Sequence, residues 1–150
     1  SCIYFGKIFN NAKITCVDTW TGSDEHVNAK FQEIENNFNN NILNHLGSQR
    51  VEKLKLSSDN FFEHNKNIFD LIYIDGDHET NQVYRDINNS WKILKDGGYL
   101  ILDDYTWWWY KDLNKNPATA INNFIYNNMN SIDVKNLVIW KQVLIKKKSM

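Results

Sequence analysis

The sequence predicts an α/β protein with a doubly wound, mostly parallel sheet, helices on both faces and an antiparallel hairpin at the C-terminal end. Residues 71–74 and 100–102 are near-continuous apolar runs, as expected of parallel strands covered on both faces, and each run stops at carboxylates. Strand-like segments also alternate with segments of helical periodicity. Each of these is long enough for a right-handed crossover between parallel strands.

The N-terminal half is predicted to alternate helix and strand. Residues 1–10 indicate a helix, and the β-branched residues of 13–20 indicate a short strand that ends at Asp18. A second helix is predicted from an N-cap at Ser23 or Asp24 to a stop at Gly47, followed by a strand at 51–56 and a short helix or loop. The apolar positions of this second helix follow helical spacing and are Val27, Phe31, Ile34 and Phe38.

The C-terminal half is predicted as strand, helix, strand, helix and hairpin. Asp77 is placed to cap a helix that Gly97 and Gly98 end, between strands at 69–75 and 99–104. Asn116 and Pro117 start a further helix, and residues 132–136 and 137–147 indicate two strands of a hairpin that meet near residue 136. The core positions expected in the two helices are Val83, Ile87, Trp91 and Leu94, and then Ile121, Phe124 and Ile125.

Composition favours one domain over residues 1–150, because 42% hydrophobic and 14% aromatic residues supply one sizeable core. The net charge of -1 gives no general field for nucleic acid, and the basic run at 146–148 is expected to be a solvated tail. With two cysteines and no apolar run near ~18 residues, we expect a soluble, cytoplasmic protein without a membrane partner or a disulfide scaffold.

Carboxylates end two neighbouring strands, at Asp75 and at Asp103 and Asp104. The carboxyl ends of parallel strands meet at one edge of a sheet, where open α/β folds bind their ligands. Carboxylates crowded there must share a proton or a cation, and their oxygens suit Mg²⁺ or Ca²⁺. The alternative is that these acids cap helices and face solvent, as Asp77 is expected to do.

His78 follows the first strand-end acid and is the best candidate for a general base, since an imidazole has an ordinary pKa of about 6.5. The alternative is an ordinary residue in the first turn of a helix. The aromatic run after the second acid pair predicts a lid or an acceptor-binding wall, with core packing as the alternative for one or two rings. Its members are Tyr105, Trp107, Trp108, Trp109 and Tyr110. The remaining histidines, His26, His45 and His64, lack clustered ligands and are interpreted as surface residues and not zinc ligands.

Asp18 ends the first strand, where an acid can accept both ribose hydroxyls of a nucleoside cofactor, as in NAD sites. The alternative is an aspartate that only begins the turn before Trp20. Trp20 itself is placed either to cover the ribose or adenine or to pack in the core.

Four segments together resemble the class I S-adenosylmethionine-dependent methyltransferases, in their small-molecule O-methyltransferase-like branch. The segments are VDTWTG, FDLIYIDGDH, LKDGGYLILDDY and KQVLIKK. The resemblance implies a Rossmann-like fold and cofactor contacts at Asp18, Trp20, Ser57, Ser58 and Asp75. It further implies catalytic roles for His78 and Asp75, and divalent-cation binding, for example of Mg²⁺, at Asp75, Asp103 and Asp104, although the family has asparagine where Asp104 stands. Asp59 is an alternative adenine contact, but its simpler role is an N-cap.

The function expected from this resemblance is transfer of a methyl group from S-adenosylmethionine to a hydroxyl of a small molecule or glycan. No segment matches the family's first strand and glycine-rich loop, so we expect an N-terminally truncated domain that binds the cofactor weakly by itself. The alternatives are a nucleotide- or NAD-binding oxidoreductase and a catalytically inactive methyltransferase-fold binding module.

Overall fold

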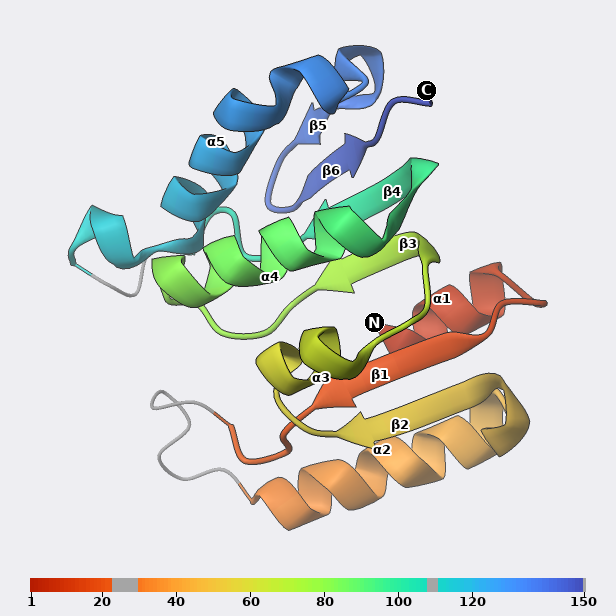
Figure 1. Ribbon diagram of the computed structural model, residues 1–150. Coiled ribbons are helices and arrows are strands. Elements are labelled where there is room, and N and C mark those ends of the chain that lie inside the picture. The colour runs from red at the N-terminus through yellow and green to blue at the C-terminus, as the bar shows by residue number, and fades with distance from the viewer. Residues whose placement is uncertain (23–29, 108–110, 150) are drawn as a thin grey trace. The chain divides into compact units, whose positions relative to one another are not determined.

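The computed structural model in Figure 1 describes residues 1–22, 30–107 and 111–149. The chain forms two compact units, Ser1–Glu63 and His64–Met150, which are described one at a time. No helix among the described residues is both long and apolar enough to cross a membrane. The single domain expected over residues 1–150 stays a prediction.

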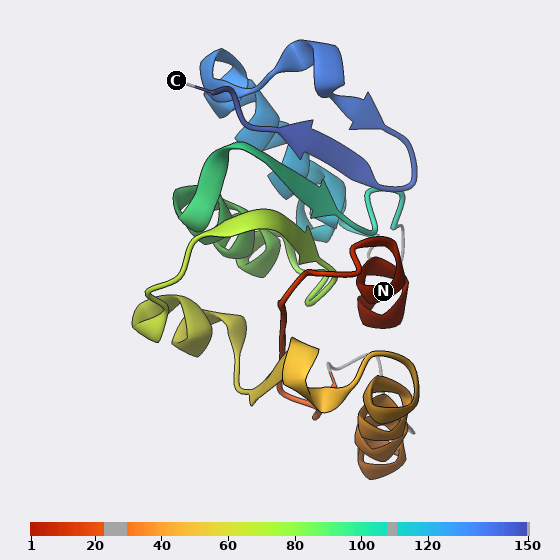
Figure 2. The same cartoon turned by 90° about the vertical axis from the view of Figure 1, so that its right-hand side faces the viewer.

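The first unit contains a parallel pair of strands with helices around it. Its elements are α1 (Cys2–Ile8), β1 (Ile14–Asp18), α2 (Phe31–His45), β2 (Val51–Lys55) and α3 (Ser58–His64). β1 pairs with β2 from Ile14 opposite Val51 to Asp18 opposite Lys55. Helices α1 and α2 lie on one side of this pair and α3 on the other, as Figure 2 shows.

Helix α2 begins later than predicted, at Phe31, with Lys30 as its N-cap. The predicted caps Ser23 and Asp24 and the predicted apolar position Val27 lie outside the described residues. The buried face of α2 also differs from the predicted one, since Ile34 is 50% exposed whereas Ile42 is buried. Glu35 takes the inward position because its carboxylate is held by Lys53 and Lys55 of β2, at 2.5 and 2.6 Å. The stop at Gly47 is confirmed, because this residue has a φ of 79°.

The second unit contains a mixed four-stranded sheet. Its elements are β3 (Phe69–Ile74), α4 (Thr80–Ile93), β4 (Leu94–Leu102), α5 (Pro117–Asn128), β5 (Val138–Ile139) and β6 (Val143–Lys146). The strand order is β3-β4-β6-β5; β3 and β4 are parallel, whereas β6 is antiparallel to both of its neighbours. Helices α4 and α5 cover the same face of this sheet (Figures 1 and 2). The predicted α/β class with a C-terminal antiparallel hairpin is therefore confirmed.

The core of this unit lies between α4, α5 and the sheet, and it follows from the apolar spacing of each element. Trp91 of α4 meets Phe124 of α5 edge to face, with ring centroids 5.2 Å apart. The predicted stripe of α4 is confirmed at Val83, Ile87 and Leu94, although Leu94 already belongs to β4. The fully buried members of the core include Ile87, Leu100, Ile121, Phe124, Ile132, Val143 and Ile145.

Two boundaries around α4 differ from prediction. Asp77 is not the cap; Glu79 is, and Asp77 Oδ1 instead accepts the Glu79 amide at 2.8 Å. The helix ends at Ile93, so Gly97 and Gly98 lie inside β4 and do not stop the helix. Tertiary contacts require glycine at position 98, because a Cβ there would lie 2.8 Å from Lys95 O and 2.9 Å from Asp70 O.

The closing hairpin is also placed differently. Both of its strands come from residues 137–147, with Val138 opposite Leu144 and Ile139 opposite Val143. Residues 134–136, predicted as strand, form a 3₁₀ turn instead. The cause is local, because Asp133 Oδ1 accepts the Lys135 amide at 3.2 Å and so starts the turn.

Candidate active site

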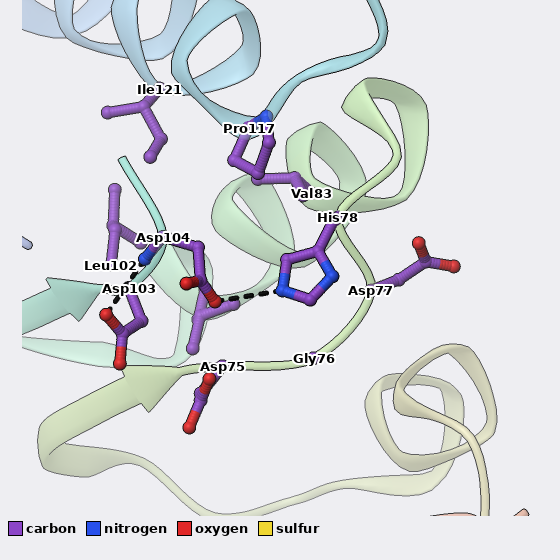
Figure 3. A pocket seen from close by; sticks show the side chains of 11 residues that line it. Asp75, Gly76, Asp77, His78, Val83, Leu102, Asp103, Asp104, Pro117 and Ile121 are labelled. Atoms are coloured by element: carbon purple, nitrogen blue, oxygen red, sulfur yellow. Dashed lines mark hydrogen bonds and ion pairs between the residues drawn. The ribbon is translucent and has the colours of Figure 1, made fainter. Parts of the chain in front are cut away.

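The ends of β3 and β4 bring the predicted acids together. Ile74 is opposite Leu102 in the parallel register, and the Asp103 amide donates to Ile74 O at 2.9 Å. Asp75 and Asp103 therefore leave the sheet side by side, as predicted. They line a pocket (Figure 3), whose lining residues are Ile74, Asp75, Gly76, Asp77, His78, Val83, Leu102, Asp103, Asp104, Pro117 and Ile121.

Asp103 is the most strongly hydrogen-bonded acid of this group. Its Oδ2 accepts from the Tyr73 hydroxyl and, at 3.0 Å, from Gln142 Nε2, while Oδ1 accepts the Asp104 amide at 2.8 Å. Burial acts to raise the pKa of Asp103, but donation from Tyr73, Asp104 and Gln142 outweighs it and lowers that pKa. Burial and the bond to Asp103 raise the pKa of the Tyr73 hydroxyl. Asp103 is thus a carboxylate fixed in position by a neutral phenol and an amide.

Asp75 is in the opposite electrostatic situation. Partial burial and the nearby charges of Asp103 and Asp104 raise the pKa of its carboxyl group. Folding therefore disfavours the charged form of the Asp75 carboxyl group relative to the unfolded chain. A perturbed acid at a pocket is typical of functional sites.

Asp75→Asn should consequently stabilise the protein at neutral pH, where it removes a charge that the fold disfavours. A raised folded-state pKa contributes stability that is fully present below the ordinary value of 3.8 and is lost as the pH rises through the raised value. We expect a rise in Tm of about 1–3 °C at pH 7 that vanishes near pH ~3.5. Thermal unfolding at both pH values measures it.

Asp70→Asn is the matched control, because Asp70 lies on the same strand with its side chain 84% exposed and bonded to Lys95 at 2.7 Å. Its Tm should change by less than about 1 °C at either pH. An equal rise for both variants, or a fall for Asp75→Asn, would contradict the assignment.

His78 and Asp104 form an acid–imidazole pair at this edge. His78 Nε2 lies 2.9 Å from Asp104 Oδ2 (Figure 3). Asp104 has a left-handed φ of 56°, a conformation in which aspartate and asparagine are enriched among non-glycine residues. Trp107 stacks on the imidazole with centroids 4.1 Å apart and planes at 8°. Stacking on Trp107 thus fixes the plane of the His78 ring, and the bond to Asp104 fixes its orientation within that plane.

The comparison with known families covers the part of the chain that holds these strand-end acids and the imidazole. A family model described as a methyltransferase domain matches residues 1–105. The chain belongs to this methyltransferase family. The match covers β1, β3, β4 and the His78–Asp104 pair, which are the parts that carry the predicted site.

Solved structures with a similar fold include methyltransferases. The O-methyltransferase NovP superposes with a TM-score of 0.71 at 16% identity, over 98% of this chain and 66% of NovP. MycE methyltransferase from the mycinamycin biosynthetic pathway, in complex with Mg, SAH and mycinamycin VI, gives 0.59 at 11% identity, over 97% of this chain and 49% of MycE. The methyltransferase domain described here therefore spans about two thirds of NovP and half of MycE.

A curated relative by sequence is the uncharacterized protein R132 of Acanthamoeba polyphaga mimivirus. It is 44% identical over 39 residues, which are 26% of this chain and 18% of R132. This match is too short to extend the family assignment.

Four of the predicted cofactor residues, Asp18, Trp20, Ser57 and Ser58, belong to the first unit, whereas Asp75 belongs to the second. Asp18 is exposed at the end of β1, and its Oδ1 accepts the Trp20 amide at 2.6 Å. Trp20 is only 8% exposed; its ring lies 5.3 Å from that of Phe38, with Lys53 Nζ 4.3 Å from the indole centroid. In this structure Trp20 packs in the core of the unit, as the alternative interpretation had it.

The residues that follow β2 form the beginning of helix α3. Ser57 Oγ accepts the Asn60 amide at 3.2 Å, so Ser57 provides the side-chain cap of α3. Asp59, expected as the cap, lies instead in the first turn of the helix that starts at Ser58. Adenine contacts at Ser57 and Ser58 stay predictions.

The acids at the pocket do not fit a divalent cation as they are arranged here. Among residues 1–22, 30–107 and 111–149, no three His, Cys, Asp or Glu side chains form a group that could hold a metal ion. The reason lies in their partners, since Asp103 Oδ2 is occupied by Tyr73 and Gln142, and Asp104 Oδ2 by His78. The metal role of Asp75, Asp103 and Asp104 stays a prediction that needs these contacts to change.

The aromatic loop divides between the two predicted roles. Tyr105 packs against the core and its hydroxyl donates to Asn122 Oδ1 at 3.0 Å, whereas Trp107 covers His78. The other predicted members of this loop, Trp108, Trp109 and Tyr110, lie outside the described residues, as does His26.

Tyr73 and Gln142 were not predicted as site residues. Tyr73 had a usable signal, because it lies two positions before Asp75 and so shares its face of the strand. No sequence signal indicated Gln142, because it lies 39 positions after Asp103 and is brought to it by the turn between β5 and β6.

Proposed function

We propose that this methyltransferase domain transfers a methyl group from S-adenosylmethionine to a hydroxyl oxygen of a small-molecule or glycan acceptor. The observation that carries the proposal is the bond between His78 and Asp104 at the carboxyl edge of β3 and β4. Methylation of oxygen needs removal of the hydroxyl proton, and an imidazole oriented by a carboxylate is suited to accept it. The O-methyltransferase fold of NovP supports the same reaction class.

The residues divide the chemistry between them. S-adenosylmethionine, when bound, supplies the methyl group on a sulfonium centre. Asp104 Oδ2 accepts the Nε2–H of His78, so the imidazole is oriented to take up the hydroxyl proton and Asp104 stabilises the resulting imidazolium. Trp107 keeps the imidazole plane fixed during this proton transfer.

Asp75 and Asp103 give the pocket its negative field. Burial and then the two neighbouring carboxylates raise the pKa of Asp75, so the pocket favours a cationic or hydrogen-bond-donating group beside them. A sulfonium cation and an acceptor hydroxyl both meet this requirement. Asp75 is therefore retained as a proposed catalytic and cofactor-binding residue.

Asp18 is the proposed anchor of the cofactor ribose, because a strand-end carboxylate accepts two hydroxyl donors at once. Asp18→Asn keeps the oxygen that accepts the Trp20 amide and removes only the charge. In the full-length protein we expect the Kd for S-adenosylhomocysteine to rise about 10–100-fold. Isothermal titration calorimetry measures this.

Asp112→Asn is the matched control, since Asp112 Oδ1 accepts the amide two residues ahead, from Asn114, at 3.0 Å in the same manner as Asp18. Its Kd should equal that of the wild type. An unchanged Kd for Asp18→Asn would remove Asp18 from the cofactor site.

The other functions considered are distinguished by the same assay. The family match favours methyl transfer over an NAD-dependent oxidoreductase, and NAD should not compete with S-adenosylhomocysteine. A binding module would retain cofactor affinity without turnover in the presence of phenol or sugar hydroxyls.

A further inference from the structure

The first unit contains a pair of thiols that the proposed methyl transfer does not use. Cys2 lies at the start of α1 and Cys16 in the middle of β1, yet their sulfur atoms are 3.3 Å apart. Both residues are free cysteines that are neither fully buried nor fully exposed. Two sulfurs at this distance need to approach by only about 1.3 Å to reach disulfide bond length.

We propose that Cys2 and Cys16 form a redox modification site, in which a hydroperoxide converts the two thiols into an intramolecular disulfide. Cys2 attacks the peroxide as a thiolate and the O–O bond breaks, so that its sulfur takes up one oxygen as a sulfenic acid and hydroxide (or, from an organic hydroperoxide, an alkoxide that water protonates) leaves. The Cys16 thiol then attacks the Cys2 sulfur, which forms the S–S bond and releases water. Two electrons pass from the two sulfurs to the peroxide, so no further oxidant is required.

The roles of the two sulfurs follow from their hydrogen bond. The Cys16 thiol donates to Cys2 Sγ, so the negative charge is favoured on Cys2. This bond lowers the pKa of Cys2 to about 7, whereas donation to Cys2 together with burial raises the pKa of Cys16. Cys2 is the attacking residue and Cys16 the resolving residue.

The disulfide would connect two residues that are 14 positions apart. It would thereby join helix α1 to β1, the strand that ends in Asp18. Cross-linking at this separation restricts the unfolded chain and stabilises the fold. The oxidised first unit should therefore unfold at a higher temperature than the reduced one, and dithiothreitol should reverse the difference.

The experiment is peptide mass mapping of the full-length protein under non-reducing conditions after treatment with hydrogen peroxide. We expect one Cys2–Cys16 peptide that has lost two hydrogens. Cys16→Ser should accumulate a sulfenic acid on Cys2 that dimedone captures, whereas Cys2→Ser should give at least about tenfold less adduct on Cys16. Wild-type protein in which both thiols survive, or in which they cross-link only between molecules, would overturn the proposal whether or not the variants fold.

Discussion

Replacing His78 with alanine is expected to lower kcat for methyl transfer by about 10²–10⁴-fold, because the acceptor hydroxyl loses its general base. Cofactor affinity should stay within about twofold, since the proposed ribose anchor is a different residue, Asp18. The measurement is S-adenosylhomocysteine formation by the full-length protein with phenol and sugar acceptors. His45→Ala is the control, because His45 is exposed in the last turn of α2 and should have wild-type activity.

Asp104→Asn tests the positioning role within the same pair. Asparagine tolerates the left-handed φ of 56°, so the backbone is preserved while the charge on the His78 partner is lost. We expect kcat to fall about 10–100-fold with little change in KM, and the double variant with His78→Ala to be no worse than His78→Ala alone. Activity above half of wild type in His78→Ala would remove the pair from the reaction.

Gly98→Ala is expected to have the largest effect on stability. The added Cβ would lie 2.8 Å from Lys95 O and 2.9 Å from Asp70 O, and backbone atoms of two strands cannot yield as a flexible side chain can. We expect a loss of about 2–3 kcal/mol in the free energy of unfolding and a fall in Tm of roughly 5–10 °C. Urea unfolding followed by circular dichroism gives the first value directly.

Gly76→Ala is the matched control, because a Cβ at Gly76 meets no atom within 4 Å. Its stability should change by less than about 0.5 kcal/mol. Equal stability of the two variants would show that β3 and β4 are not as closely apposed at Gly98 as the structure has them.

The sequence was informative wherever local chemistry determines the structure. Apolar runs that stop at Asp75 and Asp103 predicted two parallel strands, and their register then brought the acids together. Asn116 and Pro117 marked the start of α5, because proline is favoured at the first position of a helix.

Features that depend on tertiary contacts could not be predicted in this way. Gly97 and Gly98 indicated a helix stop, but Gly98 is required by the close approach of two backbone carbonyl groups, one from β3 and one from β4. Trp20 left two roles open, and the choice between them depends on Phe38 and Lys53, which come from later elements. Gln142 reaches Asp103 only because the hairpin returns it to the sheet edge.

The site therefore combines a predictable part and an unpredictable one. The acids and His78 follow from strand ends and Tyr73 from its place on β3, whereas the contact of Gln142 with Asp103 follows from the register of β6 against β4. Donation from Tyr73 and Gln142 also helps to keep Asp103 charged beside its neighbouring acids.

The central claim is that this methyltransferase domain moves a methyl group onto oxygen, and one measurement tests it most directly. Full-length protein is incubated with S-adenosylmethionine carrying a CD₃ group and with phenol and sugar acceptors, and the products are examined by mass spectrometry and NMR. We predict a CD₃ ether whose yield collapses in His78→Ala. Saturable binding of S-adenosylhomocysteine with no labelled acceptor, or label found only on nitrogen or carbon, would contradict the claim.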